Sequence, residues 1–221
     1  MNDAQVRKNH KLDSEDVFIT DNAADFPPDS PVAFLTAEIN VERENILRYD
    51  AMQASGFAGK RAAHEIYEDC RRRLADLLDK YVLAAAIVDD DIKGTAARFK
   101  NPYPRSDQKL IARAVSFHAD SADIESELKR AGLDEGDRVL LLTGKDQFQQ
   151  AAGNYASCKE RQAEATGGLI ESFRKAMALS RRRDKRVKMK YRDNPAKLAA
   201  WAVASHLERP PKRGKKLIVD S

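Results

Sequence analysis

Residues 60–92, KRAAHEIYEDCRRRLADLLDKYVLAAAIVDDDI, decide the fold class. Their apolar or small residues recur at alternating steps of four and three, the spacing of a helix that packs lengthwise on another helix. These positions are Ala63, Tyr67, Cys70, Leu74, Leu77, Tyr81, Ala84 and Val88. Charged residues of both signs lie between them, where they face water and pair three or four residues apart. The stretch therefore predicts a long helix of a helical bundle.

A second apolar series with the same spacing predicts a second long helix. Its members are Leu141, Phe148, Ala151, Tyr155, Cys158, Ala165, Leu169, Phe173 and Ala176. Gly167 and Gly168 fall inside this series, and Gly56 and Gly59 separate the first series from another predicted helix over residues 31–55. Because glycine weakens a helix by about 1 kcal/mol relative to alanine, each pair is either a turn or a kink. At Gly56 and Gly59 the sequence favours a continuous or kinked helix.

Two dipeptides mark helix starts by combining an N-cap side chain with a proline in the first turn. They are Ser30-Pro31, before the helix over residues 31–55, and Asn194-Pro195, before a short helix over residues 196–208. We expect the short helix to lay the indole of Trp201 on the main bundle. His206 and Glu208, at its end, are predicted to form a capping or salt-bridge pair.

The segment between the two long helices is predicted to hold a loop and one further helix. Gly94, Pro102 and Pro104 indicate a loop over residues 93–105. Ser106 and Asp107 are typical of a helix start, and this helix is predicted to run to Ala131 and to stop at Gly132. Asp134 then opens the second long helix, with Asp137 as a weak capping acid. At the N-terminus, residues 3–24 predict only a weak amphipathic helix that is interrupted near Asn22.

Together these signals predict an elongated, all-α bundle of four or more helices, two of them long. Residues 1–209 are expected to form one helical-bundle domain, with residues 1–29 as a loosely packed N-terminal segment and residues 210–221 as a disordered basic tail. A shift of 106 residues aligns the two apolar series, for example Tyr49 with Tyr155 and Tyr67 with Phe173. An internal duplication of a unit with one shorter and one long helix explains this match, but helical patterns also match by chance.

Composition excludes several classes of protein. Charged residues make up 33% of the 221 residues and hydrophobic residues 42%, and no apolar run is long enough to span a bilayer, so we expect a cytoplasmic protein without a membrane partner. The two cysteines, Cys70 and Cys158, occupy apolar positions of the predicted helices and are expected to behave as small buried hydrophobes.

No motif predicts catalysis, a cofactor or a metal. The run Asp89-Asp90-Asp91 resembles the aspartate-rich motif of helical prenyl-diphosphate enzymes, but Lys93 and Gly94 replace the further carboxylate that such a magnesium site needs. No histidine follows a glutamate by three residues, as helical di-iron sites require. The sequence also lacks zinc-type cysteine pairs, a phosphate-binding loop and a nucleophile elbow.

Charge is distributed unevenly along the chain. Residues 174–221 contain 16 Lys and Arg against 4 Asp and Glu, whereas residues 1–173 contain 23 against 31. The candidate anion or nucleic-acid contacts are Arg181, Arg182, Arg183, Arg186, Lys188, Lys190 and Arg192. The first five of these side chains are predicted to be solvent-exposed. These charges go around the helix instead of forming one stripe, and aromatic residues among them are few.

Three segments carry a resemblance to a known group of proteins. They are the C-terminal run KYRDNPAKLAAW followed by ASHLERP (residues 190–201 and 204–210), the run RFKNPYPRSDQ (residues 98–108), and the break FPPDS (residues 26–30). Together they resemble a group of uncharacterised bacterial proteins of similar length. The resemblance implies an all-helical fold and a bacterial source, and it implies no activity and no functional residues. The basic tail and the run over residues 181–190 are more basic than the group leads us to expect.

From these observations the first functional hypothesis is a non-enzymatic helical scaffold or protein-interaction module that binds a protein partner or itself. The alternative is an electrostatic nucleic-acid-binding protein that uses residues 174–216, which the sequence does not favour.

Overall fold

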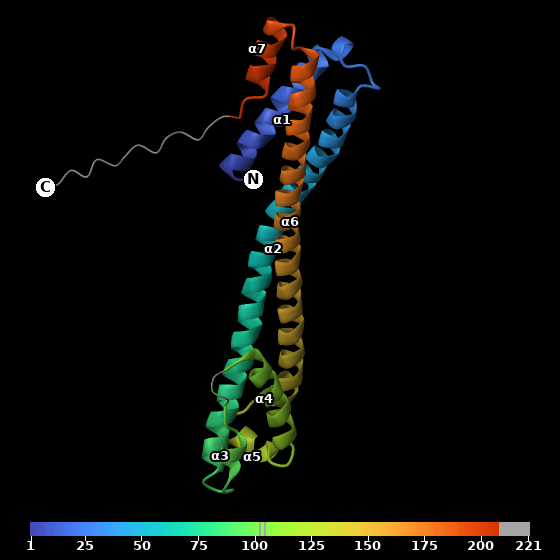
Figure 1. Cartoon of the computed structure of the whole chain (residues 1–221). Helices are drawn as coiled ribbons and strands as arrows, with labels where there is room; N and C mark the ends of the chain where they lie inside the picture. Colours follow the sequence, from blue (N-terminus) through green and yellow to red (C-terminus); the bar gives the residue numbers. More distant parts are fainter. Residues whose placement is uncertain (102, 104, 208–221) are drawn as a thin grey trace, which may run out of the picture. The chain divides into compact units, whose positions relative to one another are not determined.

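The computed structural model describes residues 1–101, 103 and 105–207. These residues form seven α-helices and one short 3-10 turn, η1 (Ala23–Asp25), and they contain no β-strand (Figure 1). The helices are α1 (Asp3–Asp21), α2 (Pro31–Val88), α3 (Thr95–Arg98), α4 (Asp107–Asp120), α5 (Glu125–Arg130), α6 (Asp137–Lys190) and α7 (Pro195–Ala204). The all-α fold with two long helices, of 58 and 54 residues, is therefore confirmed. None of the described helices is both long and apolar enough to cross a bilayer.

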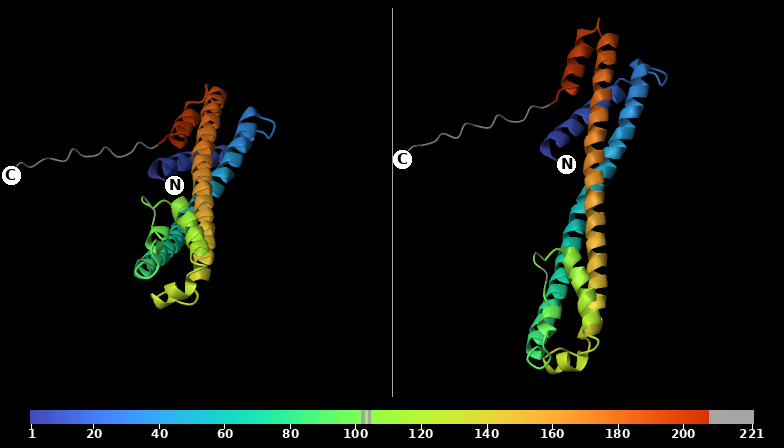
Figure 2. Two further views of the ribbon diagram at one scale, coloured as in Figure 1. Left: turned by 90° about the horizontal axis from the view of Figure 1, so that it is seen from below. Right: turned by 60° about the horizontal axis from the view of Figure 1, so that its bottom comes forward.

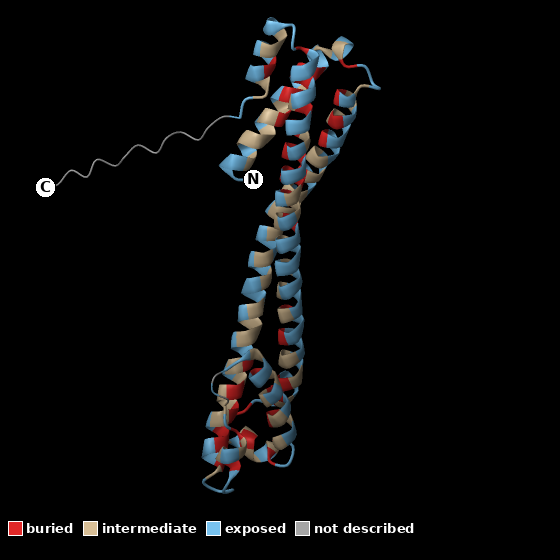
Figure 3. Cartoon of the chain, in the orientation of Figure 1, coloured by how far each residue is buried: buried red, intermediate tan, exposed pale blue. Residues whose placement is uncertain are grey.

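Both long helices pass through their glycine pairs without a break. α2 continues across Gly56 and Gly59, as the sequence favours, and α6 continues across Gly167 and Gly168. Burial along α6 confirms the predicted apolar series, because Phe148, Ala151, Ala165, Leu169, Phe173 and Ala176 are buried (Figure 3). Near the middle of the series, Tyr155 and Cys158 are only half-buried. α2 and α6 begin 106 residues apart, and the internal duplication stays a prediction.

Contacts along the chain group the residues into two compact units. Unit 1 comprises Met1–Ala54 and the chain from Ala163 onwards, and unit 2 comprises Ser55–Gln162. Each long helix therefore contributes one part to each unit. The sequence predicts a single domain over residues 1–209, and the part of that span beyond residue 207, like the predicted tail over residues 210–221, lies outside the described residues.

In unit 1 the N-terminal part of α2 and the C-terminal part of α6 run antiparallel, and α1 and α7 pack against them (Figure 2). One cluster joins Leu12 of α1 to Ile39 of α2 and Phe173 of α6. The sequence predicts a loosely packed N-terminal segment, but α1 is packed into the core of unit 1. The reason is that Leu12, Glu15, Phe18 and Ile19 share one face of α1, and all four are buried.

The second cluster of unit 1 centres on Trp201 of α7. Its side chain is fully buried, and its ring packs edge-on against Phe18 at 5.1 Å between centroids. The indole Nε1 donates a hydrogen bond to Asp184 Oδ1 at 2.9 Å. The Asn194 side chain caps α7 by accepting from Lys197 N at 3.1 Å. The predicted cap and the predicted docking of Trp201 are both confirmed.

In unit 2 the short helices α3, α4 and α5 pack against α2 and α6 around Tyr81, Phe99 and Phe117. The single helix predicted over residues 106–131 is wrong, because α4 ends at Asp120 and α5 begins at Glu125. The turn between them brings Ile124 into the core together with Leu128 of α5, which one straight helix would not do. Gly132 ends α5 with φ +109°, a conformation that favours glycine.

Three local signals in the segment between α2 and α6 have different outcomes. Asp137 Oδ2 accepts from Asp134 N at 2.8 Å, as predicted, but α6 begins at Asp137 and not at Asp134. Ser106 makes no side-chain cap for α4. Asp89, from the aspartate run after α2, accepts from the backbone N–H groups of Gly94 and Ala96 at 2.8 and 3.0 Å, and these hydrogen bonds hold its pKa below the usual range. Asp89 therefore stabilises the turn that connects α2 to α3.

Candidate functional site

The seven predicted contact residues lie on the last turns of α6 and just beyond them, in unit 1. Ser180, Arg183, Val187 and Tyr191 recur every three or four residues and form the buried face of this part of α6. Arg183 is therefore fully buried, and its predicted exposure is wrong. Basic residues on all sides of the helix make this unavoidable, because at least one of them must face the core.

Arg183 belongs to an ion network that joins α1, α2 and α6. Its guanidinium donates to Glu15 Oε2 at 2.8 Å, to Asp16 Oδ1 at 2.6 Å and to Thr36 Oγ1 at 3.1 Å. Glu15 is also buried, and it accepts from Lys11 and from the Ser180 hydroxyl. Arg43 of α2 bridges Asp13 and Asp16. Three cations thus meet three carboxylates, so Arg183 serves the fold and leaves no charge for a ligand.

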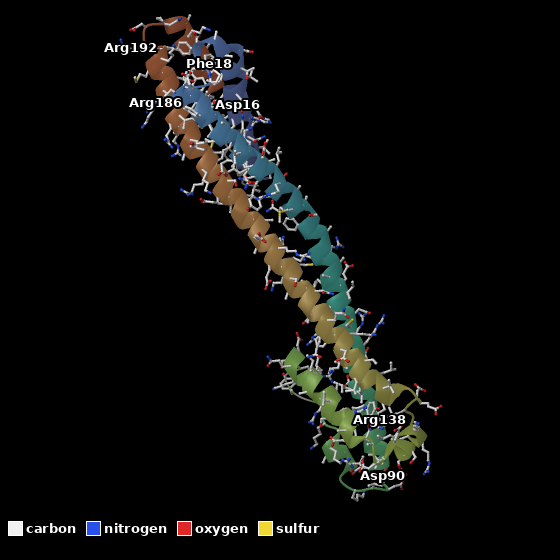
Figure 4. The ribbon with its side chains drawn as sticks, turned by 90° about the vertical axis from the view of Figure 1, so that its right-hand side faces the viewer. Asp16, Phe18, Asp90, Arg138, Arg186 and Arg192 are labelled. Atoms are coloured by element: carbon white, nitrogen blue, oxygen red, sulfur yellow. The ribbon has the colours of Figure 1, made fainter. Side chains whose placement is uncertain are left out.

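Two of the exposed candidates are paired to neighbouring carboxylates. Lys188 lies 2.9 Å from Asp184, and Arg192 lies 3.0 Å from Asp193. In contrast, Arg181, Arg182, Arg186 and Lys190 are exposed and have no hydrogen-bond or ion-pair partner among the described residues. Figure 4 marks Arg186 on α6 and Arg192 just beyond its end, with Asp16 and Phe18 on α1. Only these four predicted residues are free to meet a ligand.

Three of these free cations share one face of α6 with two residues that the prediction omitted. Positions 182, 185, 186, 189 and 190 have the i, i+3, i+4, i+7, i+8 spacing of a single helix face. Arg182, Lys185, Arg186 and Met189 line one side of a hollow of about 520 Å³, and Pro31, Phe34, Leu35 and Glu38 of α2 line the other. Arg186, Met189 and Lys190 also line an adjoining hollow of about 330 Å³ beside Phe26 and Pro27. A subset of the charges therefore does form one stripe.

We name this surface the basic groove and define it by Pro31, Phe34, Glu38, Arg182, Lys185, Arg186, Met189 and Lys190. Its apolar side chains are open to solvent, with Phe34 59% and Met189 68% exposed. The carboxylate of Asp25 at one end is already engaged, because it accepts from the Tyr191 hydroxyl at 2.7 Å. Burial, together with this hydrogen bond, raises the pKa of Tyr191. Four cations against Glu38 leave the groove positively charged.

Phe34 and Met189 could be found from the sequence only in part. Phe34 belongs to the apolar side of the helix predicted over residues 31–55, but Leu35 and Ile39 face the core and Phe34 does not. Met189 and Lys185 lie within the basic run, and the spacing that places them beside Arg182 and Arg186 is visible in the sequence. Which of the helix faces meets α2 is decided by packing, and no local pattern reveals it.

Other residue clusters offer less chemistry. The described residues contain no group of three or more His, Cys, Asp or Glu side chains placed to hold a metal ion. In unit 2, His64 stacks on Tyr155 at 5.0 Å, and Tyr155 stacks on Tyr67 at 5.5 Å. Burial and a hydrogen bond to Asp107 raise the pKa of Tyr67 to about 12. These rings pack on one another and pin α2 to α6 within unit 2.

Comparison of the chain with protein-family models, with curated proteins and with solved structures found no match. The resemblance of the C-terminal run to a bacterial group therefore stays a prediction.

Proposed function

We propose that the protein is a non-enzymatic interaction module whose basic groove binds an acidic, amphipathic helix of a partner protein. The observation that supports this is the alternation of free cations with exposed apolar side chains on one surface. Arg182, Lys185, Arg186 and Lys190 have no partner among the described residues, and Phe34 and Met189 lie between them in the open. A helix with carboxylates beside an apolar stripe satisfies both kinds of side chain at once.

The lining of the groove favours a helix over a nucleic acid. A phosphate backbone is bound by cations spread along its path, and single strands add aromatic stacking. Phe34 is the only aromatic side chain among the residues that define the basic groove, and Met189 and Pro31 offer apolar surface that a phosphate cannot use. Arg181 and Lys188 lie on other faces of α6 and Arg192 lies beyond its end, so they do not extend the stripe. A helix seated between α2 and α6 uses the apolar floor as well as the charge.

The proposal includes a cytoplasmic location and a protein without catalytic groups. Cys70 and Cys158 are free thiols, which fits a reducing compartment. The bacterial source implied by the C-terminal run is part of the same proposal.

Selection of binders from a displayed library of random helical peptides tests the proposed ligand class. We expect the selected helices to be rich in Asp and Glu and to be amphipathic. Their affinity should fall about tenfold or more for the double variant Arg182→Gln/Arg186→Gln, because two charge-assisted contacts are lost. Phe34→Ala should weaken binding independently of salt, because its contribution is apolar.

The matched control is Arg181→Gln/Lys188→Gln, which removes the same number of charges from the same turns of α6 outside the groove. It should change peptide affinity by no more than about twofold. Neutral or basic selected peptides, or equal losses in the two double variants, would contradict the proposal. Duplex DNA serves as the competing probe. DNA binding at physiological salt that falls steeply with added salt and is lost in the groove variant would support the nucleic-acid alternative.

A further inference from the structure

A second hollow of unit 1 lies between α1 and α7, away from the residues of the basic groove. Its volume is about 490 Å³, and its lining comprises Arg7, His10, Lys11 and Ser14 of α1, with Ala202, Val203 and His206 from α7 and the residues after it. The four α1 residues have the i, i+3, i+4, i+7 spacing of one helix face. Docking of α7 through Trp201 holds the other side in place.

The lining supplies hydrogen-bond donors and no carboxylate. Arg7, His10 and His206 have side chains without a hydrogen-bond or ion-pair partner among the described residues. The predicted pair of His206 with Glu208 stays a prediction, because Glu208 lies outside the described residues. Lys11 is held by Glu15 and by Ser180, 2.7 Å away, so its charge is largely offset by the buried network. Ser14 donates its hydroxyl hydrogen to the carbonyl of His10 at 2.9 Å and therefore adds no free donor. Three donors on two elements remain unused.

This donor set contrasts with the other basic residues that α1 meets in unit 1. Arg43 and Arg183 each contact two carboxylates, and Lys197 contacts Asn22 and lies 3.8 Å from Asp25. The carbonyl end of α7 opposes an anion, but two of its carbonyls, those of Trp201 and Val203, already accept from Ser205 N and His206 N. The hollow thus brings together the Arg7 cation and two imidazole groups, and no carboxylate is among its lining residues.

We propose that the hollow between α1 and α7 is a binding site for the phosphoryl group of a small phosphate monoester. Guanidinium and imidazole groups that converge from two sides match the several oxygens of a phosphoryl group. The hollow is larger than a phosphate ion, and Ala202 with the 79% exposed Val203 supplies an apolar wall for the organic part of the ligand. This site is independent of the proposed function of the basic groove.

Titration of the full chain with inorganic phosphate, followed by the imidazole NMR signals of its four histidines, tests the site. His10 and His206 should shift together along one saturable curve. His64 and His118, which belong to unit 2, are internal controls and should not follow it. Chloride at equal ionic strength should leave all four signals nearly unchanged. A phosphate monoester such as glycerol 3-phosphate should bind more tightly than phosphate alone.

Substitutions then separate the site from general charge. Arg7→Gln should weaken phosphate binding about tenfold, since it removes the one permanent free cation of the hollow. Lys8→Gln removes a charge from the adjacent position of α1 outside the hollow and should have no more than about a twofold effect. The groove variant Arg182→Gln/Arg186→Gln should leave the phosphate titration unchanged. Equal losses for Arg7→Gln and Lys8→Gln, or shifts of all four histidines alike, would overturn the proposal.

Discussion

At the scale of single residues, Gly168 is required by the ring of Tyr49. A Cβ atom at position 168 would lie 2.4 Å from Tyr49 Cζ and 2.5 Å from Cε1, closer than any real contact. Gly168→Ala should therefore destabilise the protein by about 1–3 kcal/mol through overpacking, less the gain in helix propensity. Chemical denaturation monitored by circular dichroism measures the change.

The adjacent glycine is the natural control. Gly167 has nothing within 4 Å of its Cβ position, so Gly167→Ala should stabilise α6 by up to about 1 kcal/mol. The cost at position 168 should vanish in a Tyr49→Ala background, because the ring that causes it is gone. If both glycines respond alike, packing against Tyr49 is not the reason for Gly168.

Arg183 shows how burial changes the meaning of a basic residue. Replacing it with methionine removes one of the two cations that pair with the fully buried Glu15, and breaking a buried ion pair in this way typically costs about 3–5 kcal/mol. Arg182→Gln, one residue away in the basic groove, should change the free energy of unfolding by no more than about 0.5 kcal/mol. Adding Glu15→Gln to Arg183→Met should recover only part of the loss, because it removes the buried Glu15 charge but leaves the largely buried Lys11 without its carboxylate. Thermal unfolding of the wild type, the two single variants and the double variant measures these changes. An unchanged melting temperature for Arg183→Met would contradict the role of the ion network in stability.

The sequence contains a basic run but not the division of labour within it. Arg181, Arg182 and Arg183 are consecutive and chemically identical, yet one faces solvent, one lines the groove and one is buried. The partners that make burial possible, Glu15 and Asp16, lie more than 150 positions away in the chain. A local pattern carries no information about such a distant pairing, so this part of the candidate site could not be predicted.

At the scale of elements, α7 is the helix whose sequence and structure agree most closely. Its cap and its proline start are predicted because they depend on neighbouring residues, and its buried indole is predicted although the contacts come from Phe18 and Asp184. Its end is predicted less well, since α7 stops at Ala204 and not at residue 208. Trp201→Ala should lower the free energy of unfolding by about 3–5 kcal/mol, since it empties a fully buried site and leaves Asp184 without its indole donor. Val203→Ala on the exposed face is the control and should be nearly neutral.

Asn194→Ala tests the cap of the same helix. It should cost about 1 kcal/mol, because the Lys197 amide loses its acceptor. An unchanged melting temperature for Trp201→Ala would mean that α7 does not dock in solution, and the hollow between α1 and α7 would then lose one wall.

The elements between the long helices show the limit of local signals. The long apolar series predicted α2 and α6 because lengthwise packing repeats the same contact at every turn. The break between α4 and α5 has no such repeat and no strong turn residue to mark it. Ser121 and Ile124 are buried there because they pack into unit 2. Tertiary packing overrides the helical pattern there.

At the scale of the whole molecule, the division into two units raises the question of whether they fold separately. The sequence predicts one domain, because 221 residues are enough for one sizeable core and both apolar series belong to one helical bundle. Unit 2, however, is one continuous stretch of chain, Ser55–Gln162, and contains its own core cluster of fifteen buried residues from Leu74 to Phe148. Unit 1 needs two distant stretches of chain to form its clusters.

We therefore expect a fragment of residues 55–162 to fold alone, because it contains every residue of the core cluster of unit 2. Its circular dichroism should be helical, and its unfolding should be cooperative. Leu78→Ala, which empties a fully buried position, should destabilise the fragment and the full chain by the same amount, about 2–5 kcal/mol. In the full chain, Trp201→Ala should leave the unfolding transition of unit 2 unchanged. The expectation fails if the fragment is unfolded, or if Leu78→Ala and Trp201→Ala shift one common unfolding transition of the full chain. Either result would mean that the two units form the single cooperative domain that the sequence predicts.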